Sequence, residues 1–125
     1  MSQINALNWF EIYVSDMDRA RAFYTTILGH ELEVTSMGDG SPMAMFPFDM
    51  EKGIGGSLTK MEGCAPGPGG TLVYLNAESQ LDAILERIPG AGGHIIRPKF
   101  PIPPHGHIAI FSDTEGNVVG LHSMS

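Results

Sequence analysis

The stretch that decides the fold runs from residue 9 to residue 29 and has the sequence WFEIYVSDMDRARAFYTTILG. In its first six residues, the apolar Phe10, Ile12 and Val14 alternate with Trp9, Glu11 and Tyr13. This alternation predicts a strand over Trp9–Val14. Asp16 is a typical helix N-cap, and apolar residues then recur with a 3.6-residue period until a glycine at position 29. The stretch therefore predicts a strand followed by a helix, Met17–Leu28, that lies on a sheet.

The same order of elements occurs a second time in residues 71–93. A strand is expected over Thr71–Asn76, a helix over Gln80–Ile88 and a stop at the glycine-rich segment 90–93. Each copy is followed by strand and turn sequence. The expected strands are about Glu31–Ser36, Met43–Asp49 and Gly53–Thr59 in the first copy, and His94–Lys99, His107–Ser112 and Asn117–His122 in the second.

Two copies of one supersecondary unit can bury their apolar faces together, so this internal repeat predicts architecture first. We expect an α+β fold made of two βαβββ modules. The modules are expected at about residues 5–60 and 71–125, joined by a glycine- and proline-rich linker at 61–70, within a single domain over 1–125.

Composition excludes several classes of function. The net charge is −7, and the seven Lys and Arg residues are scattered, which disfavours nucleic acid and anionic membranes. No apolar run approaches the roughly 20 residues of a membrane span, and the N-terminus lacks signal-peptide features, so a cytoplasmic protein is expected. The lone Cys64 excludes a disulfide framework. Charged residues make up only 17% of the chain, so some apolar surface is expected to meet a second copy in a homodimer.

Three motifs, in order, carry a resemblance to a known family. They are Val14–Tyr24 leading to Leu28-Gly29, then Gly55–Leu58, and finally Phe111–Asn117. Over essentially its whole length the chain resembles the vicinal oxygen chelate superfamily, the group of glyoxalase I, bleomycin-resistance proteins and extradiol dioxygenases. The resemblance implies curved mixed sheets around a central groove.

Enzymes of that superfamily hold a divalent metal with one ligand each from the first, fourth, fifth and eighth strands, usually His or Gln, Glu, His and Glu. Aligning the motifs places these positions on Trp9, Gly56 or Ser57, Val73 or Leu72, and Gly120. These residues offer at most one weak contact, the Ser57 hydroxyl, which does not make a transition-metal site. We therefore expect no metal at the usual site and no other cofactor.

The first strand carries an unusual mixture of side chains on the side that we expect to face the groove. Trp9 and Tyr13 would form an apolar wall for a small-molecule ligand. Between them stands Glu11, which is a candidate for binding or catalysis; its alternative role is a rim carboxylate paired with a basic side chain.

Three histidines in the second module form the other candidate group. A four-residue hairpin loop at Asp113–Gly116 would place His107 directly opposite His122. His105 would follow on the same face if the strand extends through Gly106. Such a set could bind substrate, supply a general base or hold a metal in a nonstandard way. The alternative is that histidines near strand ends are solvated and inert, and a one-residue slip would separate the pair.

Three functions stay open. The first is a glyoxalase-like or bleomycin-resistance-like protein that lacks the usual ligands and binds a small organic molecule in the groove. The second is a lyase, isomerase or dioxygenase-like enzyme with Glu11, His107 and His122 as catalytic candidates. The third is a subunit whose task is association with another protein. The sequence does not name the ligand, because cavity shape depends on side-chain placement.

Overall fold

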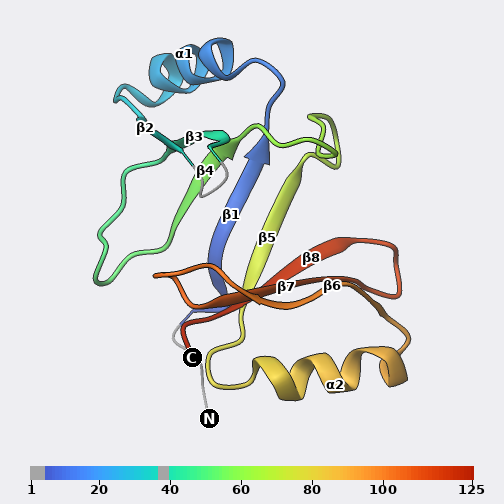
Figure 1. Ribbon diagram of the computed structural model, residues 1–125. Helices are drawn as coiled ribbons and strands as arrows, with labels where there is room; N and C mark the ends of the chain where they lie inside the picture. The colour runs from blue at the N-terminus through green and yellow to red at the C-terminus, as the bar shows by residue number, and fades with distance from the viewer. Residues whose placement is uncertain (1–4, 37–39) are drawn as a thin grey trace. The chain divides into compact units, whose positions relative to one another are not determined.

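The computed structural model of the protein describes residues 5–36 and 40–125, and its elements form two βαβββ modules (Figure 1). The first module contains β1 (Leu7–Tyr13), α1 (Met17–Leu28), β2 (Glu33–Ser36), β3 (Pro42–Met45) and β4 (Gly55–Thr59). The second contains β5 (Thr71–Asn76), α2 (Leu81–Ala91), β6 (His94–Pro101), β7 (His107–Ser112) and β8 (Val118–Ser123). The predicted α+β fold with two such modules is confirmed.

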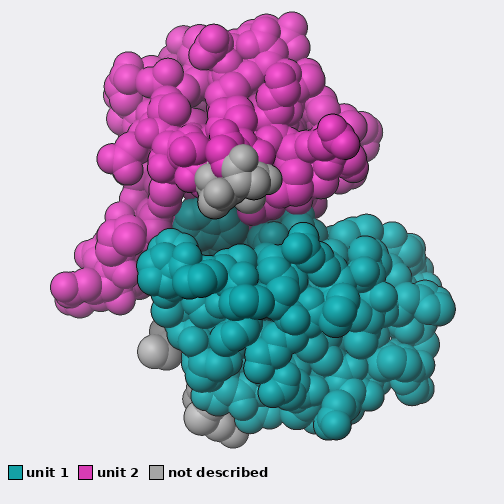
Figure 2. Space-filling model, viewed as in Figure 1, with its two compact units in different colours: residues 1–9, 72–125 teal, residues 10–71 magenta. Residues whose placement is uncertain are grey.

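The chain divides into two compact units, shown in Figure 2. Unit 2 comprises residues 10–71, and unit 1 comprises residues 1–9 and 72–125, so the divisions fall inside β1 and β5. The strand order is β2-β3-β4-β1 in the first module and β5-β8-β7-β6 in the second. Strands β5 and β8 run parallel, whereas β7 is antiparallel to both β6 and β8, so the pairing is mixed as expected.

Helix α1 begins and ends where the sequence predicts. The Asp16 side chain accepts a hydrogen bond from the Arg19 backbone N–H at 3.0 Å, which caps the first turn. Gly29 ends the helix in the left-handed region, with φ of 79° and a hydrogen bond from its N–H to the Thr25 carbonyl at 3.0 Å.

The core of unit 2 lies between α1 and its sheet. Its buried members are Val14, Leu32, Ala44 and Leu58, and the side chains packed against them are Ile12, Met17, Ala20, Tyr24 and Phe46. Ile12 and Val14 of the first strand segment therefore face the helix. Because side chains alternate along a strand, Glu11 and Tyr13 point to the other side of the sheet.

Helix α2 covers the second sheet and runs further than predicted. It continues past Ile88 through Pro89 to Ala91, and Gly92 ends it with φ of 101°. The stop itself falls in the predicted glycine-rich segment 90–93, and Pro89 is tolerated because in the last turn its missing N–H interrupts little of the helix. The core of unit 1 contains Ala77, Leu81, Ile88, Ala109 and Leu121. Within the described part of the chain, neither helix has the length and apolar character that crossing a membrane requires.

Strand β3 is shorter than predicted. It ends at Met45, and one further backbone hydrogen bond follows, from the Phe46 N–H to the Gly56 carbonyl at 3.0 Å. Pro47 has no N–H to donate to the ladder, so pairing stops there. The chain then turns at Asp49, whose carboxylate accepts from the Glu51 N–H at 2.8 Å. The segment from Phe46 to Ile54 is thereby a loop and not the strand that the sequence predicts up to Asp49.

Candidate functional site

The first strand places a carboxylate where water hardly reaches it. Glu11 is only 6% exposed, and the Tyr13 hydroxyl donates a hydrogen bond to its Oε1 at 3.0 Å. Trp9, two residues before Glu11, is half-buried. The three residues share one side of β1 by alternation, as predicted. Burying a carboxylate costs free energy unless it is well partnered, so the Tyr13 hydrogen bond helps to hold Glu11 in this position.

Strand β4 adds two buried hydroxyls on the same side of the sheet. Leu58 belongs to the core beneath α1, so its neighbours Ser57 and Thr59 point the other way. Both are fully buried, and their Oγ and Oγ1 atoms lie 2.9 Å apart in a hydrogen bond. We call the set Glu11, Tyr13, Ser57 and Thr59 the polar face of unit 2. It holds three of the four buried polar residues in the described part of the chain.

At the metal-ligand positions that the resemblance implies, the structure shows which of the alternative residues faces which side of the sheet. A Cβ on Gly56 would lie 2.2 Å from the Phe10 ring, so this glycine points toward the α1 side and Ser57 takes the position on the polar face. In unit 1, Tyr74 pairs with Gly120, and a Cβ on Gly120 would lie 2.3 Å from the Tyr74 ring. Leu72 shares that side of β5 with Tyr74 by alternation, so it is favoured over Val73.

The resulting set is Trp9, Ser57, Leu72 and Gly120, and it does not fit a transition metal. Indole, leucine and glycine side chains supply no ligand atom, and the Ser57 hydroxyl is already hydrogen-bonded to Thr59. A glutamate at position 120 would need the Tyr74 ring to move. Residues 5–36 and 40–125 contain no group of three or more His, Cys, Asp or Glu side chains placed to hold an ion.

The predicted pairing of His107 with His122 is wrong. Ser112 pairs with Val118, so the hairpin loop has five residues, 113–117, and not four. His107 consequently pairs with Ser123, and His122 pairs with Ile108. A shift of one residue moves a side chain to the other face of the sheet, so the two imidazoles point to opposite sides.

His105 is also not on the predicted strand face. Gly106 has φ of 86° and β7 begins only at His107, because residues 102–106 form a tight turn in which the Ile102 N–H donates to the Gly106 carbonyl at 2.8 Å. The part of His105 that reaches His122 is its backbone carbonyl, 2.7 Å from the imidazole Nε2. The three predicted histidines therefore do not form one catalytic group.

His122 is held in a hydrogen-bond network of unit 1. A carbonyl can only accept, so the contact to His105 assigns the proton of the imidazole to Nε2. The other nitrogen, Nδ1, then accepts from the Asn8 amide at 3.0 Å, and that amide also lies 3.4 Å from the Asn76 Oδ1. Both ring nitrogens are hydrogen-bonded within unit 1, which is the arrangement of an imidazole that supports the fold.

In the same unit, Glu78 is hydrogen-bonded to the last two residues of the described chain. Its carboxylate accepts from the Met124 N–H at 2.8 Å and from the Ser125 hydroxyl at 3.0 Å. The Met124 hydrogen bond is the largest of the causes that hold the pKa of Glu78 below its ordinary value, and burial opposes it.

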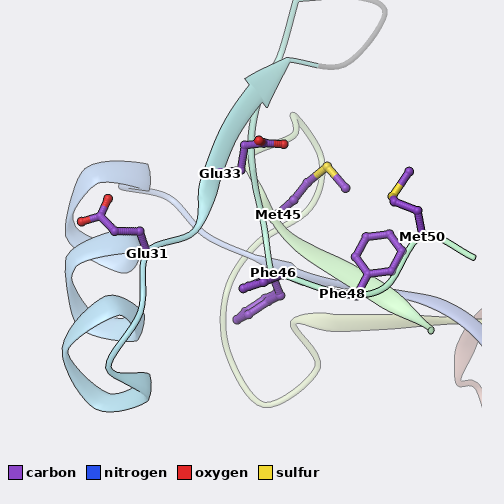
Figure 3. A pocket seen from close by; sticks show the side chains of 7 residues that line it. Glu31, Glu33, Met45, Phe46, Phe48 and Met50 are labelled. Carbon is purple, nitrogen blue, oxygen red and sulfur yellow. The ribbon is translucent and has the colours of Figure 1, made fainter. Parts of the chain in front are cut away.

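Sequence reasoning missed a cavity of about 280 Å³ at the β2–β3 edge of unit 2. Its walls come from seven residues on either side of this edge: Glu31, Glu33, Met45, Phe46, Pro47, Phe48 and Met50 (Figure 3). Glu33 pairs with Met45 across the two strands, and both lie on the side of the sheet that carries the polar face, because the neighbouring Ala44 is in the core. Glu33 and Met45 each follow a buried residue, Leu32 and Ala44, which was a usable sequence signal, but the loop that closes the cavity was expected to be a strand.

A family model matches the chain from residue 6 to residue 121, and its description is Glyoxalase/Bleomycin resistance protein/Dioxygenase superfamily. The chain belongs to this superfamily. Membership agrees with the resemblance that the three motifs carry, and it accounts for the repeated βαβββ order.

Among curated relatives, the proteins named putative glyoxylase CFP32 from Mycobacterium tuberculosis and Mycobacterium bovis are 25% identical over 118 residues. The match covers 91% of this chain but 44% of theirs, so this superfamily member spans less than half the length of these relatives.

Solved structures share the fold. Methylmalonyl-CoA epimerase from Mycobacterium tuberculosis matches with a TM-score of 0.64 at 17% identity, covering 100% of this chain and 93% of that one. The Mn(II)-bound glyoxalase from Novosphingobium aromaticivorans matches with a TM-score of 0.66 at 18% identity, covering 99% of this chain and 40% of that one. At this level of identity, both comparisons bear on the superfamily fold alone.

Proposed function

We propose that the protein binds a small organic molecule on the polar face of unit 2, without a resident metal at the superfamily's usual positions. One observation carries the proposal: Glu11, Ser57 and Thr59 are buried together on a face that does not pack against α1. Polar groups inside a protein cost free energy, and a few such groups beside apolar walls are typical of small-molecule sites.

The aromatic neighbours of Glu11 support the same proposal. Trp9 and Tyr13 flank it on one side of β1, so an apolar wall stands beside a hydrogen-bond acceptor. Large rings supply contact area, and the phenol and carboxylate fix the orientation of a bound molecule. This combination favours a ligand with an apolar body and a hydrogen-bond donor.

The alternative function is an enzyme, an isomerase or a lyase, in which Glu11 transfers a proton. Its support is the buried Glu11 carboxylate within hydrogen-bond distance of the Tyr13 phenol, since a positioned carboxylate is a common general acid or base. One of the structural relatives is an epimerase, which fits this reaction class. The histidines add nothing to this alternative, because His107 and His122 lie on opposite faces.

A thermal-shift screen of small organic molecules tests the proposal. A molecule that binds the folded state at 100 times its Kd should stabilise it by about 2.7 kcal/mol, which raises Tm by about 10 °C for a domain of this size. Trp9 is the single tryptophan, so its fluorescence reports directly on the predicted wall. Glu11→Gln should weaken the hit, whereas the exposed Glu62→Gln is the matched charge control.

The screen contradicts the proposal if no molecule raises Tm and none changes Trp9 fluorescence.

Metal content tests the metal-free part of the proposal. Elemental analysis after dialysis should find no stoichiometric Ni, Zn, Fe or Mn. About one ion per chain would reject the metal-free proposal, and Glu11→Ala would then show whether the only carboxylate of the polar face holds the ion.

We further propose a homodimer. The support is an apolar pair on the solvent side of α1, Phe23 and Ile27, which are 56% and 58% exposed and one helical turn apart. Light scattering should give twice the chain mass at micromolar concentration, and a monomer mass would contradict the proposal.

A further inference from the structure

The cavity at the β2–β3 edge is walled by apolar side chains that are held in place. A Cβ on Gly55 would lie 2.4 Å from the Phe48 ring, so the ring packs directly against that glycine. The Phe46 ring stands 5.5 Å from Phe10 and 5.7 Å from Tyr24, centroid to centroid. Both rings are thus supported by their own unit, and the cavity exists before any ligand arrives.

Methionines complete the apolar wall. Met45 extends from β3 toward Phe48, and Met50 stands on the outer side of the ring (Figure 3). Met50 is 74% exposed, so a large apolar side chain is left in water at the cavity mouth. Flexible thioethers adapt to small apolar groups, and covering Met50 would remove its apolar surface from water.

The charge in this cavity is entirely negative. Among the described residues, two glutamates line it and no Lys or Arg does. Glu31 has a partner already, because its Oε2 lies 3.5 Å from Arg21 Nη2 and its carboxylate points toward α1 in Figure 3. The Glu33 carboxylate points the other way, to the side of Met45 and Phe48. A ligand in this cavity would therefore meet the Glu33 charge.

We propose that this cavity binds the cationic, methylated end of an organic ammonium ligand. Aromatic rings and methionine sulfur attract a desolvated cation that carries methyl groups, and the Glu33 carboxylate neutralises its charge. An anionic group would meet only like charge here. The volume of about 280 Å³ suits a head group and a short chain. The inference goes beyond the proposed function, because the cavity lies at the β2–β3 edge and shares no residue with the polar face.

Three probes of nearly the same shape isolate the charge. Choline is the cation, 3,3-dimethylbutan-1-ol replaces its nitrogen by carbon, and 3,3-dimethylbutanoate carries the opposite charge. The readout is NMR of the methionine methyl groups, with the Met45 and Met50 signals assigned from Met→Leu variants. Choline should shift both signals and bind about fivefold more tightly than the alcohol, and the butanoate should not bind.

Two variants with matched controls locate the effect. Glu33→Gln should weaken choline about fivefold and leave the alcohol unchanged, while Glu86→Gln, an exposed change of the same charge on α2, should alter neither. Gly55→Ala should displace the Phe48 ring and weaken both probes, whereas Gly90→Ala introduces a methyl group with nothing within 4 Å. If Gly55→Ala does not fold, Glu33→Gln still decides the matter.

The outcomes separate this inference from the proposed function. Equal affinity for choline and the alcohol, shifts confined to other methionines, or no shift even at millimolar choline would overturn the inference. The proposed function would stand through any of these results if another molecule changes Trp9 fluorescence and depends on Glu11. Conversely, choline shifts at Met45 and Met50 with an unresponsive Trp9 in the whole screen would support the cavity and reject binding at the polar face.

Discussion

The two modules have the same kind of core beneath their helices, but they differ on the sheet face that points away from the helix. In unit 2, Ala44 of β3 pairs with Leu58 of β4, and in unit 1, Ala109 of β7 pairs with Leu121 of β8. Each Ala–Leu pair is buried beneath its own helix. A backbone hydrogen bond ends the first strand of each module in the same way, from the Val14 N–H to Thr59 at 3.0 Å and from the Ala77 N–H to His122 at 2.8 Å.

These bonds align Thr59 with His122 and, two residues earlier, Ser57 with Gly120. In unit 2 the two aligned positions hold buried hydroxyls on the polar face. In unit 1 one position has no side chain and is covered by Tyr74, and the other is an imidazole whose two nitrogens bond within the fold. The repeat therefore specifies the core, and the difference between the opposite faces locates the candidate site in unit 2.

The largest effect should come from breaking the shared core. Leu58 and Leu121 are 0% and 2% exposed, so truncating either one leaves a cavity. We expect Leu58→Ala and Leu121→Ala each to lower the free energy of unfolding by about 3 kcal/mol. Urea unfolding measures both. Costs that differ by more than about 2 kcal/mol would show that the two cores are not equivalent.

An intermediate effect should distinguish the histidines. His122→Ala leaves the Asn8 amide and the His105 carbonyl without their partner, so we expect a loss of about 2 kcal/mol of stability. The buried Nδ1 of His107 has no hydrogen-bond partner among the described residues, so His107→Ala should cost less. Urea unfolding compares the two variants.

Binding assays are the control for that comparison. Neither histidine variant should change the affinity of a ligand that reports on Trp9, because neither imidazole belongs to the polar face. Loss of binding in His122→Ala, with the fold intact, would restore a functional role for this histidine and contradict the assignment of its ring to structure.

The sequence predicts the helices better than the hairpin, for local reasons. Asp16 and Gly29 define α1 through bonds to their own neighbours, so its bounds follow from residue types alone. The β7–β8 loop instead depends on one side chain, because the Asp113 carboxylate accepts from the Asn117 N–H at 2.9 Å and adds a residue to the loop. One residue changes the face of every side chain that follows.

The candidate residues likewise include some that the sequence could predict and some that it could not. Trp9, Glu11 and Tyr13 follow from alternation along one strand, so they could be predicted. The cavity could not, because it depends on the Phe48 ring resting on Gly55, seven residues away across a loop. Contacts of this kind are set by packing and have no periodic pattern in the sequence.

The smallest expected effect concerns Glu78 of unit 1. The corresponding position in unit 2 is Ser15, which carries no carboxylate. The Met124 N–H holds the pKa of Glu78 below its ordinary value in the folded protein. Its stabilising contribution should therefore be complete above the pKa of the unfolded chain and disappear as the pH falls through the folded pKa. Glu78→Gln should flatten this part of the stability curve in urea unfolding at a series of acid pH values, whereas Glu62→Gln should not. Because Glu78 is only half-buried and solvent screens part of its charge, the effect should be smaller than that of either histidine variant. An unchanged acid limb in Glu78→Gln would mean that the Met124 contact does not contribute to folding.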